Sequence, residues 1–144
     1  MKKLIILLMS TIGFSVTAQE RPHTAAANVK VIETPLGIPG LDRERQIRIY
    51  LPPGYASSKK KYDVLYMHDG QNLFDDATSF VGEWGVDEVL NELYAEQGFE
   101  LIVVGVDNGQ QHRMQELTGW DHEKYGKAEG KEYMDFIVRT VKPY

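Results

Sequence analysis

An apolar run that ends in a polar, glycine-containing turn is the stretch of this sequence best suited to chemistry. The run covers residues 64–67, and His68-Asp69-Gly70-Gln71 follows it directly. Glycine lets the backbone turn close to a ligand with its N–H groups exposed. Acyl transfer needs such donors, because negative charge develops on the carbonyl oxygen as the tetrahedral intermediate forms. The spacing fits a plain strand-to-loop turn equally well, and both interpretations stay open.

A second polar turn, Asp107-Asn108-Gly109, follows the apolar run 99–106. Ligands of open α/β sheets bind beyond the carboxyl ends of the strands, where we expect both turns to lie. Asp107 could contact a ligand there, although Asp-Asn-Gly is also a favourable turn. His68 could touch a substrate, or it could hydrogen-bond behind the site. Arg113 follows on the next segment, three residues before Glu116, a spacing at which the two side chains can pair.

The hydrophobic pattern predicts the elements that position these turns. Val86, Val89, Leu90, Leu93 and Tyr94 recur at helical spacing, and Gly98 closes this amphipathic helix. In chain order we expect a strand at 28–34, a loop at 35–40, strands at 46–51 and 62–67, the helix from 86, a strand at 99–106, a surface segment at 110–127 and a helix at 134–141. The pattern predicts an α/β fold: an antiparallel hairpin, then parallel strands covered by helices.

The first residues predict export. Lys2 and Lys3 precede an apolar core that ends at Val16, and Val16-Thr17-Ala18 offers small residues for signal peptidase cleavage before Gln19. The core is shorter than the roughly 20 residues that span a bilayer, so we expect no stable membrane anchor after cleavage. The predicted organisation is a signal peptide at 1–18, a flexible leader at 19–27 and one domain at 28–144. Export without cysteines suits a secreted or periplasmic bacterial protein.

The amino-acid composition limits the kinds of partner and cofactor that the protein can bind. Without Lys2 and Lys3, 14 basic residues face 21 acidic ones, a net charge near −7 that argues against a nucleic-acid partner. The absence of cysteine excludes disulfides and thiolate metal sites. His112 and His122 lack the spacing of a metal motif and are expected in a solvated loop. We therefore expect no cofactor and no metal. The oligomeric state cannot be inferred.

Several linked motifs resemble the esterase family that includes enterochelin esterases and esterase D. They run in the family's order across residues 45–144: Leu51-Pro52-Pro53-Gly54-Tyr55, the segment 64–74, Trp84-Gly85-Val86-Asp87, the segment 103–109, Arg113-Met114-Gln115-Glu116 and Tyr133-Met134-Asp135-Phe136-Ile137. The resemblance implies an α/β-hydrolase fold and a serine esterase mechanism. It also implies that Gln71 donates an oxyanion-hole N–H, with Gly70 shaping the turn and His68, Asp69, Asp107 and Arg113 near the substrate.

One part of the family pattern is absent. The family's nucleophile sits in a G-x-S-x-G elbow, whereas the serines here (Ser10, Ser15, Ser57, Ser58 and Ser79) have no such setting. We therefore expect the N-terminal, incomplete half of an α/β-hydrolase sheet, from an exported serine carboxylic-ester hydrolase, inactive alone. Its substrate would be a small-molecule or carbohydrate-linked ester. The alternatives are a non-catalytic extracellular module that binds carbohydrate or another small ligand, an inactive remnant on the same fold, and an acyltransferase.

Overall fold

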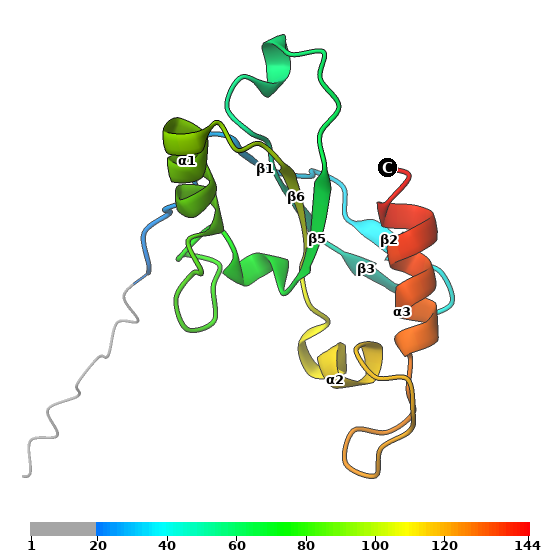
Figure 1. The fold of residues 1–144 in the computed structure, drawn as a ribbon. Coiled ribbons are helices and arrows are strands. Elements are labelled where there is room, and N and C mark those ends of the chain that lie inside the picture. The colour runs from blue at the N-terminus through cyan, green and yellow to red at the C-terminus, as the bar shows by residue number, and fades with distance from the viewer. Residues whose placement is uncertain (1–19) are drawn as a thin grey trace, which may run out of the picture.

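The computed structural model describes residues 20–144. The predicted signal peptide at 1–18 lies outside the described residues. Figure 1 shows a twisted sheet with helical segments on either side of it. The strands are β1 (Val29–Val31), β2 (Leu36–Ile38), β3 (Arg43–Arg45), β4 (Ile47–Tyr50), β5 (Val64–His68) and β6 (Ile102–Val106). The helical segments are η1 (Tyr55–Ser57), η2 (Gly70–Asn72), α1 (Val86–Gln97), η3 (Gln110–His112), α2 (Arg113–Glu116), α3 (Gly130–Phe136) and η4 (Ile137–Val141).

The main sheet has the strand order β1-β4-β6-β5. β1 and β4 pair in the predicted antiparallel sense, although the β2–β3 hairpin lies between them in the chain, and β4 also runs antiparallel to β6. β5 and β6 are parallel, as expected for two strands joined by a helix, and His68 pairs with Val106 at their carboxyl ends. The described sheet is therefore mixed, with its one parallel pair delivering two chain segments to the same edge.

Side chains alternate between two apolar cores, one on each face of the sheet. Val103 points to the face that α1 covers, together with Tyr50, Leu73, Phe74 and Leu90. Val104 points to the opposite face, where it packs with Ile47, Ile38, Tyr133 and Phe136. Figure 1 shows α1 and α3 on opposite sides of the strands. Burial on both faces explains why residues 102–106 form an almost uninterrupted apolar run.

The helix from Val86 is confirmed, and Gly98 ends it in the left-handed conformation (φ 65°). The loop predicted at 35–40 is wrong, because Leu36–Ile38 pairs with Arg43–Arg45 in a small separate hairpin. The prolines and glycines of this segment predict a loop, but it forms a strand because it pairs with a partner strand. The surface segment from residue 110 contains α2, and the last helix starts at Gly130, four residues before the predicted Met134.

Residues 21–26, within the predicted leader, are joined to the domain by hydrogen bonds. His23 Nδ1 lies 2.8 Å from Asp75 Oδ2, and the Ala26 N–H donates to Asp87 Oδ2 at 2.7 Å. These contacts place the segment beside α1 (Figure 1). Within residues 20–144, no helix combines the length and apolar character needed to cross a membrane.

Candidate functional site

The carboxyl ends of β5 and β6 form the candidate site. Because His68 and Val106 are paired, Asp69 and Asp107 leave the sheet side by side. Asp69 adopts the left-handed conformation (φ 57°) and turns the chain into η2. The main-chain N–H of Asn72 then donates to the Asp69 carbonyl at 2.8 Å, which closes the turn.

Gly70 allows this turn to lie directly on β6. A Cβ atom at residue 70 would stand 2.8 Å from both Asp107 Oδ1 and the carbonyl carbon of Gly105, and 2.9 Å from the Asp107 nitrogen. Two of these neighbours are backbone atoms, which cannot rotate away as a side-chain tip would. Glycine is therefore required by close approach, and the predicted role of Gly70 in shaping the turn has a steric basis.

Two bidentate ion pairs neutralise the carboxylates that leave the sheet. Arg113 donates from Nε and Nη2 to the two oxygens of Asp69, at 2.7 and 2.8 Å. Arg48, on β4, donates in the same way to Asp107, at 2.8 and 3.0 Å. Hydrogen bonds from Arg113, and then from Asn108, hold the pKa of Asp69 below its ordinary value despite partial burial. Asp69 is thus an ion-paired carboxylate at neutral pH, and it is not suited to donate a proton.

An amide clasp joins the two turns. The Asn108 side chain donates to Asp69 Oδ1 at 2.7 Å, and the Asn108 main-chain N–H donates to Gln71 Oε1 at 3.0 Å. The Gln71 carbonyl accepts from the Thr78 hydroxyl at 2.8 Å. The main-chain N–H of Gln71, by contrast, has no acceptor among the described residues. The clasp fixes the carbonyl and side chain of Gln71 and leaves its amide available.

A polar hollow of about 410 Å³ opens beside this amide. Its lining comes from both turns, from α2 and from the loop before α1: Asp69, Gln71, Asn72, Thr78, Ser79, Phe80, Asn108, Gln110 and Arg113. Ser79 brings a hydroxyl, which donates to the Asp76 carbonyl at 2.9 Å and accepts from Arg21 at 3.0 Å. No described histidine bonds to it, and its one carboxylate contact among the described residues is Asp76 Oδ1 at 3.3 Å, so it lacks the serine–histidine pair of an activated nucleophile.

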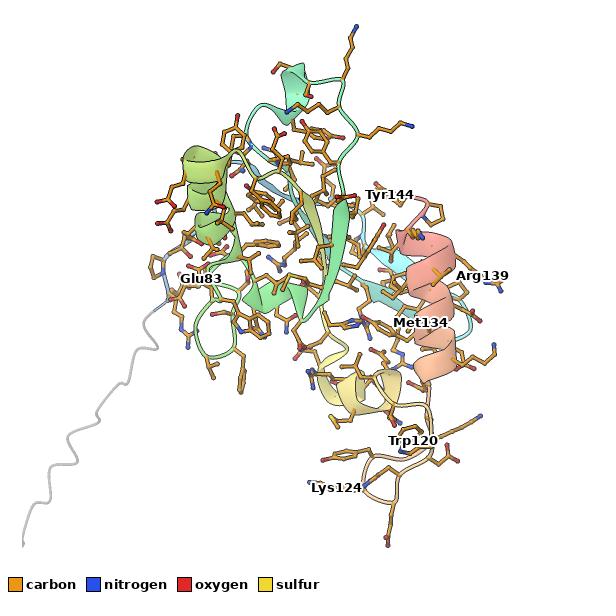
Figure 2. All side chains as sticks on the ribbon, in the orientation of Figure 1. Glu83, Trp120, Lys124, Met134, Arg139 and Tyr144 are labelled. Carbon is orange, nitrogen blue, oxygen red and sulfur yellow. The ribbon has the colours of Figure 1, made fainter. Side chains whose placement is uncertain are left out.

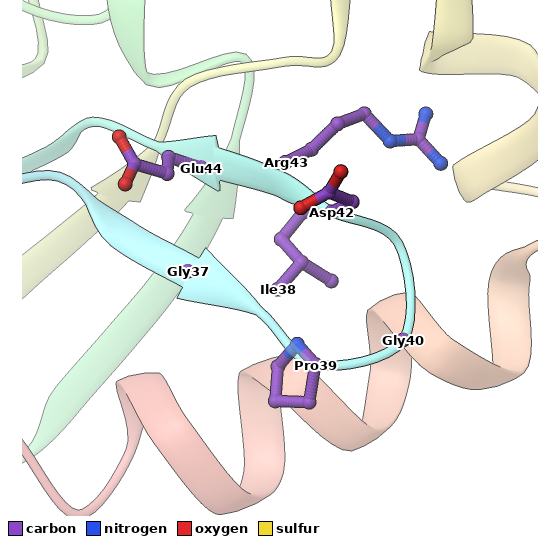
Figure 3. Close-up of a pocket in the computed structure, with 7 residues that line it drawn as sticks. All are labelled: Gly37, Ile38, Pro39, Gly40, Asp42, Arg43 and Glu44. Atoms are coloured by element: carbon purple, nitrogen blue, oxygen red, sulfur yellow. The ribbon is translucent and has the colours of Figure 1, made fainter.

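A larger hollow, of about 930 Å³, lies on the β2–β3 hairpin (Figure 3). Its lining is confined to residues 37–44 of that hairpin. Arg43, which contributes to this lining, is committed to ion pairs with Glu116 and Glu129. Polar groups from several elements converge in the smaller hollow, and we place the candidate site there.

Three of the predicted site residues, Asp69, Gln71 and Arg113, line this hollow together, with Gly70 beneath them. Asp107 is held by Arg48 and does not line it. His68 faces a different hollow, where its Nδ1 lies 3.0 Å from the Tyr133 hydroxyl. It therefore contacts a neighbouring side chain and lies outside the polar hollow.

Sequence reasoning missed the partner of Arg113. Glu116, three residues on, pairs with Arg45 and Arg43, whereas Arg113 pairs with Asp69, 44 residues earlier. It also missed Asn108, although its position in a turn beyond a strand end was the signal that drew attention to Asp107. Residues 78–80, which also line the hollow, belong to no sequence motif that could have identified them.

This architecture defines an α/β-hydrolase fold in incomplete form. The candidate site lies at the turn after β5, where Gln71 lines the polar hollow. The chain belongs to the esterase family described as Putative esterase, whose family model matches residues 38–144.

Solved structures share the fold. An IroE-like serine hydrolase from Shewanella oneidensis is 25% identical, with a TM-score of 0.58 over 80% of this chain and 36% of that protein. The siderophore hydrolase EstB from Aspergillus nidulans is 17% identical, with a TM-score of 0.62 over 83% of this chain and 43% of that protein. The BES protein from Bacillus cereus is 19% identical, with a TM-score of 0.55 over 88% of this chain and 48% of that protein.

Among curated proteins, the uncharacterized protein YbbA from Bacillus subtilis is 27% identical over 77 residues, which are 53% of this chain and 26% of YbbA. The chain thus spans about a quarter of this relative and between a third and a half of the three solved structures.

Proposed function

We propose that this chain supplies the oxyanion-hole half of an exported serine carboxylic-ester hydrolase. The observation that carries the proposal is the Gln71 N–H, which has no acceptor among the described residues and belongs to a residue lining the polar hollow. Membership of the esterase family and the hydrolase fold support the reaction class. The substrate would be a small-molecule or carbohydrate-linked ester, recognised in the extracellular space or the periplasm.

The geometry suggests how the chain would act in this reaction. Attack on an ester carbonyl places negative charge on its oxygen, and the Gln71 N–H would stabilise that charge. One preorganised donor of this kind lowers the barrier by about 3 kcal/mol. Preorganisation comes from the neighbours: Gly70 packs the turn against β6, and Asn108 holds the Gln71 side chain. Arg113 neutralises Asp69, so that a carboxylate next to the hollow repels the oxyanion less.

The nucleophile would come from sequence outside residues 1–144. None of the five serines in this chain stands in a G-x-S-x-G elbow, and Ser79, which lines the hollow, hydrogen-bonds to its own loop. We therefore propose that the 144-residue chain does not hydrolyse esters by itself.

The test compares this chain with a form extended by the sequence encoded after Tyr144. Both would be assayed with p-nitrophenyl acetate and with a fluorophosphonate probe, which labels activated serines. We expect turnover and labelling in the extended form, and neither in the short form or in an extended form whose labelled serine is changed to alanine. Turnover by the short form would refute the assignment, with Ser79→Ala as the control for a nucleophile within it. An inactive extended form would favour the non-catalytic ligand-binding alternative.

Export is tested separately. Fractionation and N-terminal sequencing of the protein from its native host should find a mature chain that begins at Gln19, outside the cytoplasm. A cytoplasmic chain that retains residues 1–18 would refute this part of the proposal.

A further inference from the structure

Three carboxylates converge where the loop after η2 enters α1, away from the candidate esterase site. They belong to Glu83, Asp87 and Glu88, and one oxygen from each lies within 4.8 Å of the others. Figure 2 shows Glu83 on the same side of the molecule as α1. Asp87 is fully buried, with none of its surface exposed, whereas Glu88 is exposed. The cluster therefore has a buried floor and a side open to solvent.

Two of the buried oxygens in this cluster have no hydrogen-bond partner. Asp87 Oδ2 accepts from the Ala26 N–H at 2.7 Å, but Asp87 Oδ1 is buried without a donor. Glu83 Oε2 is buried without a donor as well. A buried carboxylate oxygen that has lost water and gained no partner costs free energy, so native proteins pair such atoms. The cluster therefore lacks a positive group that would compensate its buried negative charge.

No arginine or lysine of residues 20–144 supplies the missing charge. None of the ion pairs in this part of the chain involves Glu83, Asp87 or Glu88. Asp87 and Glu88 lie in the first turn of α1, where the helix dipole favours negative charge. That effect leaves both orphaned oxygens unbonded.

We propose that Glu83, Asp87 and Glu88 bind a calcium ion. Three oxygens within 4.8 Å of one another can surround an ion at the 2.3–2.6 Å distances of calcium ligands. Magnesium usually keeps several waters and is bound by only one or two carboxylates, so a set of three carboxylates suits calcium better. The ligands are all carboxylates, the donors that hard cations prefer. The exposed side at Glu88 leaves room for water to complete the coordination shell.

The ion would join the loop before α1 and the start of α1 to the N-terminal segment, which is distant from both in sequence. Asp87 already holds Ala26 of the N-terminal segment, and Glu83 adjoins Trp84, whose N–H donates to the Asn72 carbonyl at 2.8 Å. The loop that carries Glu83 also contributes Phe80 to the polar hollow. Calcium at this corner would therefore hold the N-terminal segment, the loop and the start of α1 in one arrangement. This role does not depend on the proposed esterase function.

The test measures metal binding by the full chain after treatment with EDTA. Titration calorimetry with CaCl₂ at pH 7.5 should show one ion per chain, with a dissociation constant of about 1 mM or lower. Terbium, a luminescent substitute for calcium, should emit on excitation of Trp84 and be displaced by calcium. Glu83→Gln and Glu88→Gln should each weaken calcium binding about tenfold or more, because each removes one charged ligand. Asp87→Asn is less decisive, because Asp87 is buried and its loss can unfold the corner.

Glu92→Gln and Glu96→Gln are the matched controls, since both remove an exposed carboxylate from the same helix outside the cluster. They should leave calcium affinity within about twofold of the wild type. No saturable binding up to about 10 mM calcium would overturn the proposal. So would an affinity that Glu83→Gln and Glu88→Gln leave unchanged. If Asp87 and Glu88 instead share a proton, the melting temperature at pH 7.5 will not respond to calcium, which also overturns it.

Discussion

The close contact between the Gly70 turn and β6 makes a quantitative prediction for Gly70→Ala. The added methyl group would stand 2.8 Å from Asp107 Oδ1 and from the Gly105 carbonyl carbon, and β6 is the strand between β4 and β5. To relieve this clash, η2 must move away from β6, because the backbone of a strand paired on both sides can shift very little. Overpacking of this kind destabilises a protein by about 1–3 kcal/mol. Because two of the clashing atoms are backbone, we expect the upper end, about 3 kcal/mol.

Urea denaturation of the full chain measures this loss directly, and a thermal melt should show a decrease of about 10 °C. Gly37→Ala is the matched control, because a Cβ at Gly37 meets no atom within 4 Å and its φ is not in the left-handed region. We expect that control to change stability by less than about 0.5 kcal/mol. If Gly70→Ala is as mild as Gly37→Ala, the turn does not rest on β6 and the preorganisation inferred for Gln71 loses its basis.

Three further predictions concern the site and the cores around it. Asp69→Asn should lower stability by about 1 kcal/mol at pH 7, a small value because the paired Arg113 is partly exposed. The pKa of Asp69 is depressed, so the stability that its ion pair contributes is complete above about pH 4 and is lost as the pH falls through the folded-state pKa. The difference in stability between wild type and Asp69→Asn should therefore shrink in acid, and a difference that grows in acid contradicts this. Burial raises the pKa of Tyr133 to about 12, so the stability contributed by its neutral hydroxyl is complete below pH 10 and is lost as the pH rises toward 12. Thermal melts of Tyr133→Phe should not show this loss of stability at alkaline pH. In the extended, active form, Gln71→Pro removes the N–H and should lower kcat/KM about 100-fold or more, whereas Gln71→Ala keeps the N–H and should stay within about tenfold; equal losses would exclude Gln71 as the donor.

The sequence predicts those parts of the fold that depend on local pattern. Apolar residues at helical spacing from Val86, with Gly98 as the stop, identify α1 correctly, since both signals lie within a few turns of the helix. The runs around β5 and β6 are apolar because helices cover the sheet, and strands joined through α1 end at the same edge. This is why Asp69 and Asp107 could be placed side by side before their contacts were known.

Features that depend on distant partners were missed. Leu36–Ile38 contains glycine and is flanked by prolines, and it becomes a strand only because Arg43–Arg45 pairs with it. Arg113 had a carboxylate nearby in sequence, yet the fold brings it to Asp69 and gives Glu116 to Arg45. Ion-pair choices of this kind depend on how the elements are arranged in space, and residue spacing along the chain does not contain that information.

The attachment of the N-terminal segment determines the order in which this corner can assemble. During synthesis residues 21–26 leave the ribosome before the rest of the domain, but the partners of His23 and Ala26 lie 52 and 61 residues further on, at Asp75 and Asp87. The first part of the domain to be made is therefore among the last to dock, after α1 has emerged. A segment held by a few polar bonds at its margin also opens most readily. In hydrogen exchange, the amide of Ala26 should lose its protection before those of β6, and faster when Asp87 is changed.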